Sequence, residues 1–242
     1  MTVNSVWTPI IADAYANKYG EVARDFLSLV VEPSLAALEQ KRAEIASQPD
    51  RALAAFHLYD HYELILKTRM ALCLGVQSLW EQQLRSYLGN CEIQGNDSAL
   101  LNKIQSASWD HWKKDHSLKH LFSEIRGLEL ESLDSYKRLD ILQLLGNVCR
   151  HGPGPSSLTL IKRYPELWPK AGTQSKQFGV PAVAVMPVDG ALITDALLRD
   201  LVNAVQLFWL DMRIACTQAL IPSNPAMIEE VARLQALRPA LL

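Results

Sequence analysis

The segment Arg51–Leu88 constrains the fold most, because it reads as one long amphipathic helix. Apolar residues recur in it at spacings of three and four, and it contains no proline and a single glycine, Gly75. A glycine costs a helix interior about 1 kcal/mol relative to alanine, so one long helix and two helices in line both remain open. Pro49-Asp50 before the segment and Gly89-Asn90 after it are typical of helix boundaries.

The same spacing of apolar residues recurs along most of the chain. It predicts further helices over residues 9–48, 99–107, 109–128, 134–150, 195–220 and 226–237. Pro33 should kink or break the first of these, since proline lacks an N–H and clashes with the preceding turn. The one strand-like stretch, 180–188, contains two prolines and is at best an edge strand or a short β-hairpin. We therefore predict an all-α, single-domain helical bundle over 1–242, with a long irregular loop before the helix at 195.

The charge balance gives the chain no general attraction for polyanions. Its 242 residues include 24 basic and 26 acidic side chains, for a net charge of −2. Contact with RNA would therefore depend on a local patch. The longest apolar stretches are interrupted well before the ~20 residues that a membrane span requires. The N-terminus lacks a basic start followed by an apolar run, so a cytoplasmic location without membrane contact is expected.

Two histidine pairs have the spacing of metal ligands on a helix. His57 and His61 lie four residues apart, as do His116 and His120, so each pair would share a helix face. No third ligand is fixed by spacing, and solvated or hydrogen-bonded histidines are the more common outcome. Cys73, Cys91, Cys149 and Cys216 form no CxxC pair and are expected to be small buried side chains in a reducing compartment.

The segment 109–120 mixes tryptophan, histidine and lysine. Such a mixture can bind RNA by stacking and phosphate contacts. Asp110 and Asp115 dilute its charge, which favours instead a solvated helix with Trp109 and Trp112 in the core.

The segment 146–157 contains the best candidate for chemistry. Asn147, Arg150 and His151 stand at the end of a strongly apolar helix, directly before a loop with two glycines and two prolines. Asn147 and His151 are four residues apart and would share a face. A histidine can exchange a proton near neutral pH, and an arginine can bind phosphate oxygens as a fork, so the group suits metal-free RNA cleavage. The alternative is structural, with Arg150 and His151 capping the last carbonyls of the helix.

These residues resemble the HEPN superfamily of small helical proteins. In that family a helix ends in an arginine, a polar residue that is often asparagine, three further residues and a histidine. Asn147 matches the polar residue and His151 matches the histidine, whereas Gly146 occupies the arginine position. The segment 77–85 resembles an earlier helix of such proteins, and 151–157 followed by 164–168 resembles uncharacterised bacterial members. The resemblance covers residues 51–220 and leaves 9–48 and 226–237 as additional helices.

The resemblance implies a helical bundle that commonly forms a homodimer, with two motif helices near the dimer axis. Active members are endoribonucleases that need no metal or cofactor, often toxins with a cognate antitoxin, or factors in stress response and phage defence. In that reading His151 exchanges protons, Asn147 and Arg150 hold the phosphate, and Glu81 orients His151. Members that lack the motif arginine can instead be non-catalytic modules that bind RNA or a protein partner.

Overall fold

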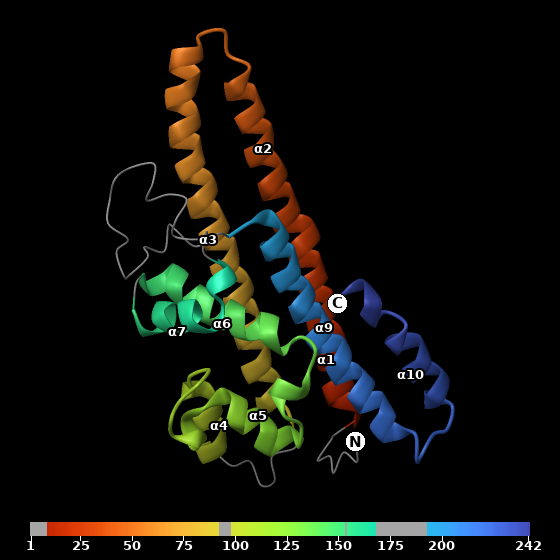
Figure 1. Ribbon diagram of the computed structural model, residues 1–242. Coiled ribbons are helices and arrows are strands. Elements are labelled where there is room, and N and C mark those ends of the chain that lie inside the picture. Colours follow the sequence, from red (N-terminus) through yellow and green to blue (C-terminus); the bar gives the residue numbers. More distant parts are fainter. Residues whose placement is uncertain (1–8, 92–97, 153, 168–192) are drawn as a thin grey trace. The chain divides into compact units, whose positions relative to one another are not determined.

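The computed structural model describes residues 9–91, 98–152, 154–167 and 193–242 (Figure 1). These residues form helices and their connections, and the predicted all-α class is confirmed. The α-helices are α1 (Pro9–Phe26), α2 (Glu32–Ala46), α3 (Arg51–Gly89), α4 (Ser98–Ser106), α5 (Leu118–Arg126), α6 (Tyr136–His151), α7 (Pro155–Arg163), α9 (Asp195–Leu220) and α10 (Met227–Gln235). The hairpin predicted at 180–188 lies outside the described residues.

The chain divides into two compact units. The first contains 1–24, 79–139 and 202–242, and the second contains 25–78 and 140–201. Helices α1, α3, α6 and α9 each contribute residues to both units. The expectation of a single domain over 1–242 stays a prediction.

The long helix predicted from the sequence is present as α3, which runs from Arg51 to Gly89 without interruption. Asp50 caps its start, because its Oδ1 accepts hydrogen bonds from the N–H groups of Ala52 (3.0 Å) and Leu53 (3.1 Å). Thr194 caps α9 in the same way, with its Oγ1 accepting from the N–H of Leu197 at 3.0 Å. Both boundaries were therefore readable from local sequence.

Pro33 is accommodated by a change of helix type. Leu27–Val31 forms a π-helical segment between α1 and α2, and Pro33 stands in the first turn of α2. The first turn of a helix tolerates proline because its N–H groups have no intrahelical acceptor. The interruption predicted at Pro33 is therefore a π-helical turn that directly precedes α2.

The helix predicted over 109–128 is wrong in its first half. Residues 108–117 form a closed loop in which Ser108 donates to the carbonyl of His116 (3.0 Å) and accepts from the N–H of Leu118 (2.8 Å). Trp109 is buried and packs edge-on against Trp80, with ring centroids 5.1 Å apart. Trp112, which the sequence placed in the core, is 83% exposed.

The first unit has an aromatic core. Trp209 and Phe208 of α9 pack against each other with ring centroids 4.8 Å apart, and the indole N–H of Trp209 donates to Gln83 at 2.8 Å. Arg126 is fully buried, lies 4.9 Å over the ring of Tyr87 and donates to the Cys91 sulfur at 3.0 Å.

The second unit is built on the antiparallel hairpin of α2 and α3 (Figure 1). Two ion pairs join the start of α9 to this hairpin. Arg199 contacts Glu32 of α2 through two hydrogen bonds of 2.6 and 2.8 Å, and Arg69 of α3 contacts Asp195 at 2.6 Å. Helices α6 and α7 complete the unit and contain the candidate site.

Candidate functional site

Helix α6 ends at a glycine that the backbone requires. Gly152 has φ +73°, in the left-handed region, and its N–H donates to the carbonyl of Val148 at 2.9 Å. Glycine enters this region without steric cost, which makes it the usual residue after a helix end. The chain therefore turns immediately after His151, which lies exposed in the last turn of α6.

Helix α7 begins three residues later, at Pro155. The N–H of Gly154 donates to the Ser157 hydroxyl at 2.9 Å, and that hydroxyl donates to the Gly154 carbonyl at 2.7 Å. Proline suits the first helical position because its missing N–H would have no acceptor there. The sequence predicted a loop with two glycines and two prolines at this place, whereas the structure has a nine-residue helix that begins at the second proline.

The far end of α7 is anchored on the start of α6 by a buried carboxylate. The side chain of Asp140 is 1% exposed and accepts from Arg163 at 2.9 Å and from the Tyr164 hydroxyl at 2.8 Å. Asp140 therefore ties the end of α7 to α6, and the hydrogen bonds between Gly154 and Ser157 define where α7 begins.

A pocket of about 310 Å³ lies where α6 ends and α7 begins. It is lined by Asn147, His151, Gly152, Gly154, Pro155 and Ser156. The predicted pair Asn147 and His151 therefore shares one face and lines one cavity. Sequence reasoning missed Ser156 as a pocket residue, although its place directly after a predicted helix break was a usable signal.

The pocket combines three features that suit a phosphodiester. His151 offers a group that exchanges protons near neutral pH, and Asn147 offers an amide N–H. The first turn of α7 has N–H groups without intrahelical acceptors and the partial positive charge of a helix N-terminus. Helix N-termini bind phosphate groups for this reason.

The opposite side of α6 packs closely against α3. A Cβ added to Gly146 would lie 2.7–2.8 Å from the Cβ, Cγ and Cδ atoms of Gln77. Gln77 is itself buried and donates to Gln143 of α6 at 3.1 Å. A side chain at 146, including the arginine of the HEPN motif, would therefore displace the Gln77 side chain or the helix that carries it.

Arg150 belongs to this packed side rather than to the pocket lining. Its Nη2 donates to the Gln77 Oε1 at 3.3 Å. Glu81 lies in the other compact unit, where its carboxylate accepts from Arg85 at 2.6 Å. Of the four residues predicted to act together, the structure thus brings two to the pocket, Asn147 and His151.

Three of the four candidate metal histidines have separate polar partners. His57 Nδ1 lies 3.2 Å from Gln48, His61 Nε2 lies 2.8 Å from the Leu38 carbonyl, and His120 Nε2 lies 3.1 Å from Glu124. Within the described part of the chain, His, Cys, Asp and Glu do not gather in a group of three or more that could hold a metal ion.

Two cysteines meet at the contact between α3 and α6. The thiol of Cys73 hydrogen-bonds to the Cys149 sulfur, which lowers the pKa of Cys149 below its ordinary value. The same contact, together with complete burial, raises the pKa of Cys73. Cys149 is partly exposed and Cys73 is buried, so the expectation of buried cysteines holds for Cys73 and not fully for Cys149.

In the described helices, no stretch is long and apolar enough to cross a membrane. Comparisons with protein-family models, curated proteins and solved structures gave no match for this chain.

Proposed function

We propose that this protein is an HEPN-like, metal-independent endoribonuclease that acts at the pocket between α6 and α7. The observation that carries the proposal is that Asn147 and His151, the two residues that match the family motif, line one pocket with the start of α7. The proposed ligand of the pocket is a phosphodiester group of RNA.

In the proposed reaction His151 accepts the proton of a ribose 2′-hydroxyl. The 2′-oxygen attacks the adjacent phosphorus and the bond from phosphorus to the 5′-oxygen breaks. The products are a 2′,3′-cyclic phosphate and a 5′-hydroxyl, and the leaving oxygen takes a proton from water or from the protonated histidine. Asn147 and the first-turn N–H groups of α7, including that of Ser156, stabilise the developing negative charge.

In this proposal the N-terminus of α7 stabilises the charge of the phosphate, which is the role of the arginine in the family. Gly146 leaves no space for that arginine, and Arg150 is bonded to Gln77. A helix N-terminus supplies positive potential without a charged side chain. The role first expected of Arg150 thus passes to the backbone of α7.

The pocket is built from one chain, so the proposed cleavage does not require the shared cleft that the family resemblance implies. That dimer arrangement stays a prediction. Growth arrest on expression, lost in His151→Ala, would place the activity in stress response or phage defence.

The test is cleavage of total RNA in EDTA by purified wild type and by His151→Ala. Wild type should cleave and leave cyclic phosphate ends, and His151→Ala should lose roughly 10²–10⁴-fold in rate. His57→Ala is the matched control, since it removes an exposed histidine outside the pocket and should cleave like wild type. Equal cleavage by His151→Ala and wild type would overturn the proposal.

A second candidate is a non-catalytic HEPN-like module that binds RNA or a protein partner. It is favoured by the packing of Gly146 against Gln77, because the motif arginine cannot be present in this arrangement. Binding of single-stranded RNA without any cleavage, weakened by His151→Ala, would establish this candidate for RNA. A preparation that neither cleaves nor binds RNA would leave a protein partner as its ligand.

A further inference from the structure

Two cysteines that the proposed cleavage does not use meet where α3 packs against α6. Cys73 of α3 is completely buried, and its thiol hydrogen-bonds to the sulfur of Cys149 in α6. Both residues belong to the same compact unit. Because they lie on different helices, a covalent bond between the two sulfurs would join segments that are distant in the chain.

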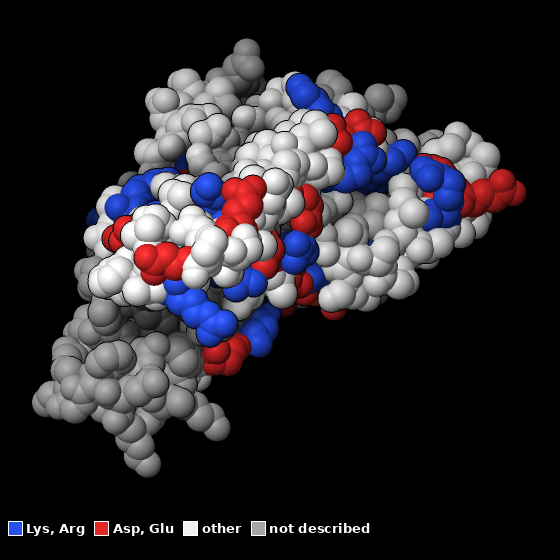
Figure 2. Space-filling model, turned by 90° about the horizontal axis from the view of Figure 1, so that it is seen from above, with Lys and Arg blue, Asp and Glu red and all other residues white. Residues whose placement is uncertain are grey.

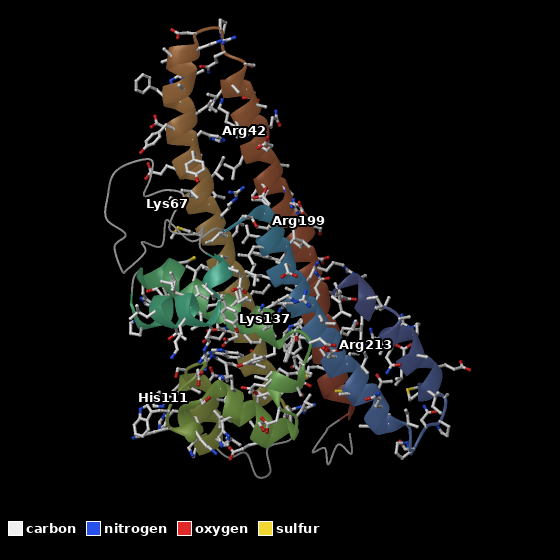
Figure 3. The ribbon with its side chains drawn as sticks, in the orientation of Figure 1. Arg42, Lys67, His111, Lys137, Arg199 and Arg213 are labelled. Atoms are coloured by element: carbon white, nitrogen blue, oxygen red, sulfur yellow. The ribbon has the colours of Figure 1, made fainter. Side chains whose placement is uncertain are left out.

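The two helices approach closely at this contact. A Cβ added to Gly146 would lie 2.8 Å from the Cβ of Gln77. Cys73 is one helical turn before Gln77, on the same side of α3, and Cys149 is three residues after Gly146 on α6. In Figure 3 the contact lies further along α3 than the labelled Lys67. A disulfide requires Cβ atoms about 3.8 Å apart, so helices packed this closely can be joined with little movement.

The two sulfurs differ in their access to solvent and in their reactivity. Cys149 is partly exposed, whereas Cys73 is not. The hydrogen bond from Cys73 lowers the pKa of Cys149 below its ordinary value, which increases the fraction of thiolate. The thiolate is the form that reacts with oxidants. An accessible cysteine of lowered pKa beside a second cysteine is the usual arrangement of redox-sensitive thiols.

The surroundings of Cys149 favour a small, uncharged oxidant. Its partial exposure admits a small molecule more readily than a peptide disulfide such as oxidised glutathione. The chain has a net charge of −2, and Figure 2 shows Lys and Arg beside Asp and Glu on the face that it presents. Such a surface does not concentrate anionic oxidants, and oxidised glutathione is anionic. Hydrogen peroxide is both small and neutral.

We propose that Cys149 and Cys73 are a peroxide-sensitive dithiol that closes to a disulfide between α6 and α3. The Cys149 thiolate attacks one oxygen of hydrogen peroxide, the O–O bond breaks and hydroxide leaves, so that Cys149 becomes a sulfenic acid. The Cys73 sulfur then attacks the Cys149 sulfur, the S–O bond breaks, and the leaving hydroxide takes the Cys73 proton to form water. The two thiols together lose two electrons, and the peroxide is reduced to two molecules of water.

The other two cysteines of the chain provide an internal comparison. Cys91 and Cys216 are both buried, and both accept hydrogen bonds from Arg126, at 3.0 and 3.9 Å. Neither sulfur is accessible to an oxidant in the folded protein. Peroxide should therefore leave both of them reduced under conditions that oxidise Cys149.

The experiment treats the folded full chain with a small molar excess of hydrogen peroxide. The remaining thiols are then blocked with N-ethylmaleimide in denaturant, and the protein is digested with trypsin, which separates the four cysteines into four peptides. Wild type should yield peptide 70–85 linked by a disulfide to peptide 139–150, and dithiothreitol should release the two. The peptides that contain Cys91 and Cys216 should carry the blocking group.

Three variants separate the steps of the reaction. In Cys73→Ser the disulfide cannot form, so Cys149 should accumulate as a sulfenic acid that dimedone captures. In Cys149→Ser the thiol of Cys73 should remain reduced, because it is buried. Cys91→Ser is the matched control and should form the same linked peptide as wild type. Far-UV circular dichroism should be equal for all four proteins.

The wild-type result decides the proposal by itself, whether or not each variant folds. Peroxide treatment that leaves Cys149 reduced would overturn the proposal, and so would oxidation of Cys149 to a sulfinic acid while Cys73 stays reduced. A link between the Cys149 residues of two copies would overturn it as well. The readout is the chemical state of the cysteines and involves no RNA, so the proposal does not rest on the proposed function and can fail separately from it.

Discussion

The two sides of α6, a helix of sixteen residues, contact different parts of the molecule. Asp140, Asn147 and His151 follow one another on the side that meets α7, where they anchor that helix and line the pocket. Gln143, Gly146 and Arg150 lie on the side that meets α3, where Gln77 contacts all three. The first side presents Asn147 and His151 to the pocket, and the second has a glycine at 146, where a Cβ would meet Gln77. The difference teaches that close packing against α3 limits the size of residue 146, whereas the side chains of Asn147 and His151 line a pocket.

The largest stability effect should come from the anchor of α7. Asp140→Ala should lower the free energy of unfolding by roughly 3 kcal/mol, because Arg163 and Tyr164 would lose a buried partner. Because Arg163 is partly exposed, the expected loss of unfolding free energy is at the lower end of the range for broken buried ion pairs. Urea denaturation measures it. Glu39→Ala, which breaks the exposed pair with Arg42, is the control and should leave the midpoint nearly unchanged. An Asp140→Ala protein as stable as the control would show that α7 is held elsewhere.

The next effect tests the packed side directly. Gly146→Ala should destabilise the protein by about 1 kcal/mol, since overpacking costs about 1–3 kcal/mol and the better helix propensity of alanine returns about 1 kcal/mol. Gly20→Ala in α1 is the matched control. A Cβ there would meet Trp209 at an ordinary 3.5 Å, so this variant should be as stable as wild type or more stable.

The overpacking account also predicts a rescue. Gln77→Ala removes Cγ and Cδ, two of the three atoms that the new Cβ meets, so adding Gly146→Ala to it should cost less than in wild type. Thermal denaturation of the four proteins measures this coupling. Equal costs in both backgrounds would contradict the close approach of α3 and α6.

The smallest effect concerns the thiols at the same contact. Because Cys73 lowers the pKa of Cys149, the thiolate of Cys149 should form at lower pH and react first with iodoacetamide. Cys73→Ala should move the midpoint of the rate profile to higher pH and slow labelling several-fold near neutral pH. Cys73→Ser, which retains a hydrogen-bond donor, should preserve the wild-type profile. Peptide mass spectrometry measures both, and unchanged labelling in Cys73→Ala would show that Cys73 does not activate Cys149.

The sequence predicted those parts of the molecule that depend on neighbouring residues. The length of α3, its Asp50 cap and the shared face of Asn147 and His151 all follow from helical spacing and local hydrogen bonding. The loop at 108–117 was missed because tertiary packing of Trp109 against Trp80 overrides a helical pattern. The partners of Arg150 and Gly146 were also missed, since Gln77 lies about seventy residues away in the chain. Contacts of that range leave no periodic signal.

The most direct test of the two-sided account is a comparison of RNA cleavage rates in EDTA for His151→Ala, Asn147→Ala, Arg150→Ala and Glu81→Gln. We expect His151→Ala to abolish cleavage and Asn147→Ala to slow it, because both residues line the pocket. We expect Arg150→Ala and Glu81→Gln to cleave at close to the wild-type rate, because their described contacts are with Gln77 and Arg85. If Arg150→Ala loses cleavage as completely as His151→Ala, the reaction does not take place in this pocket as described, and the division of α6 into a packed side and a chemical side is wrong.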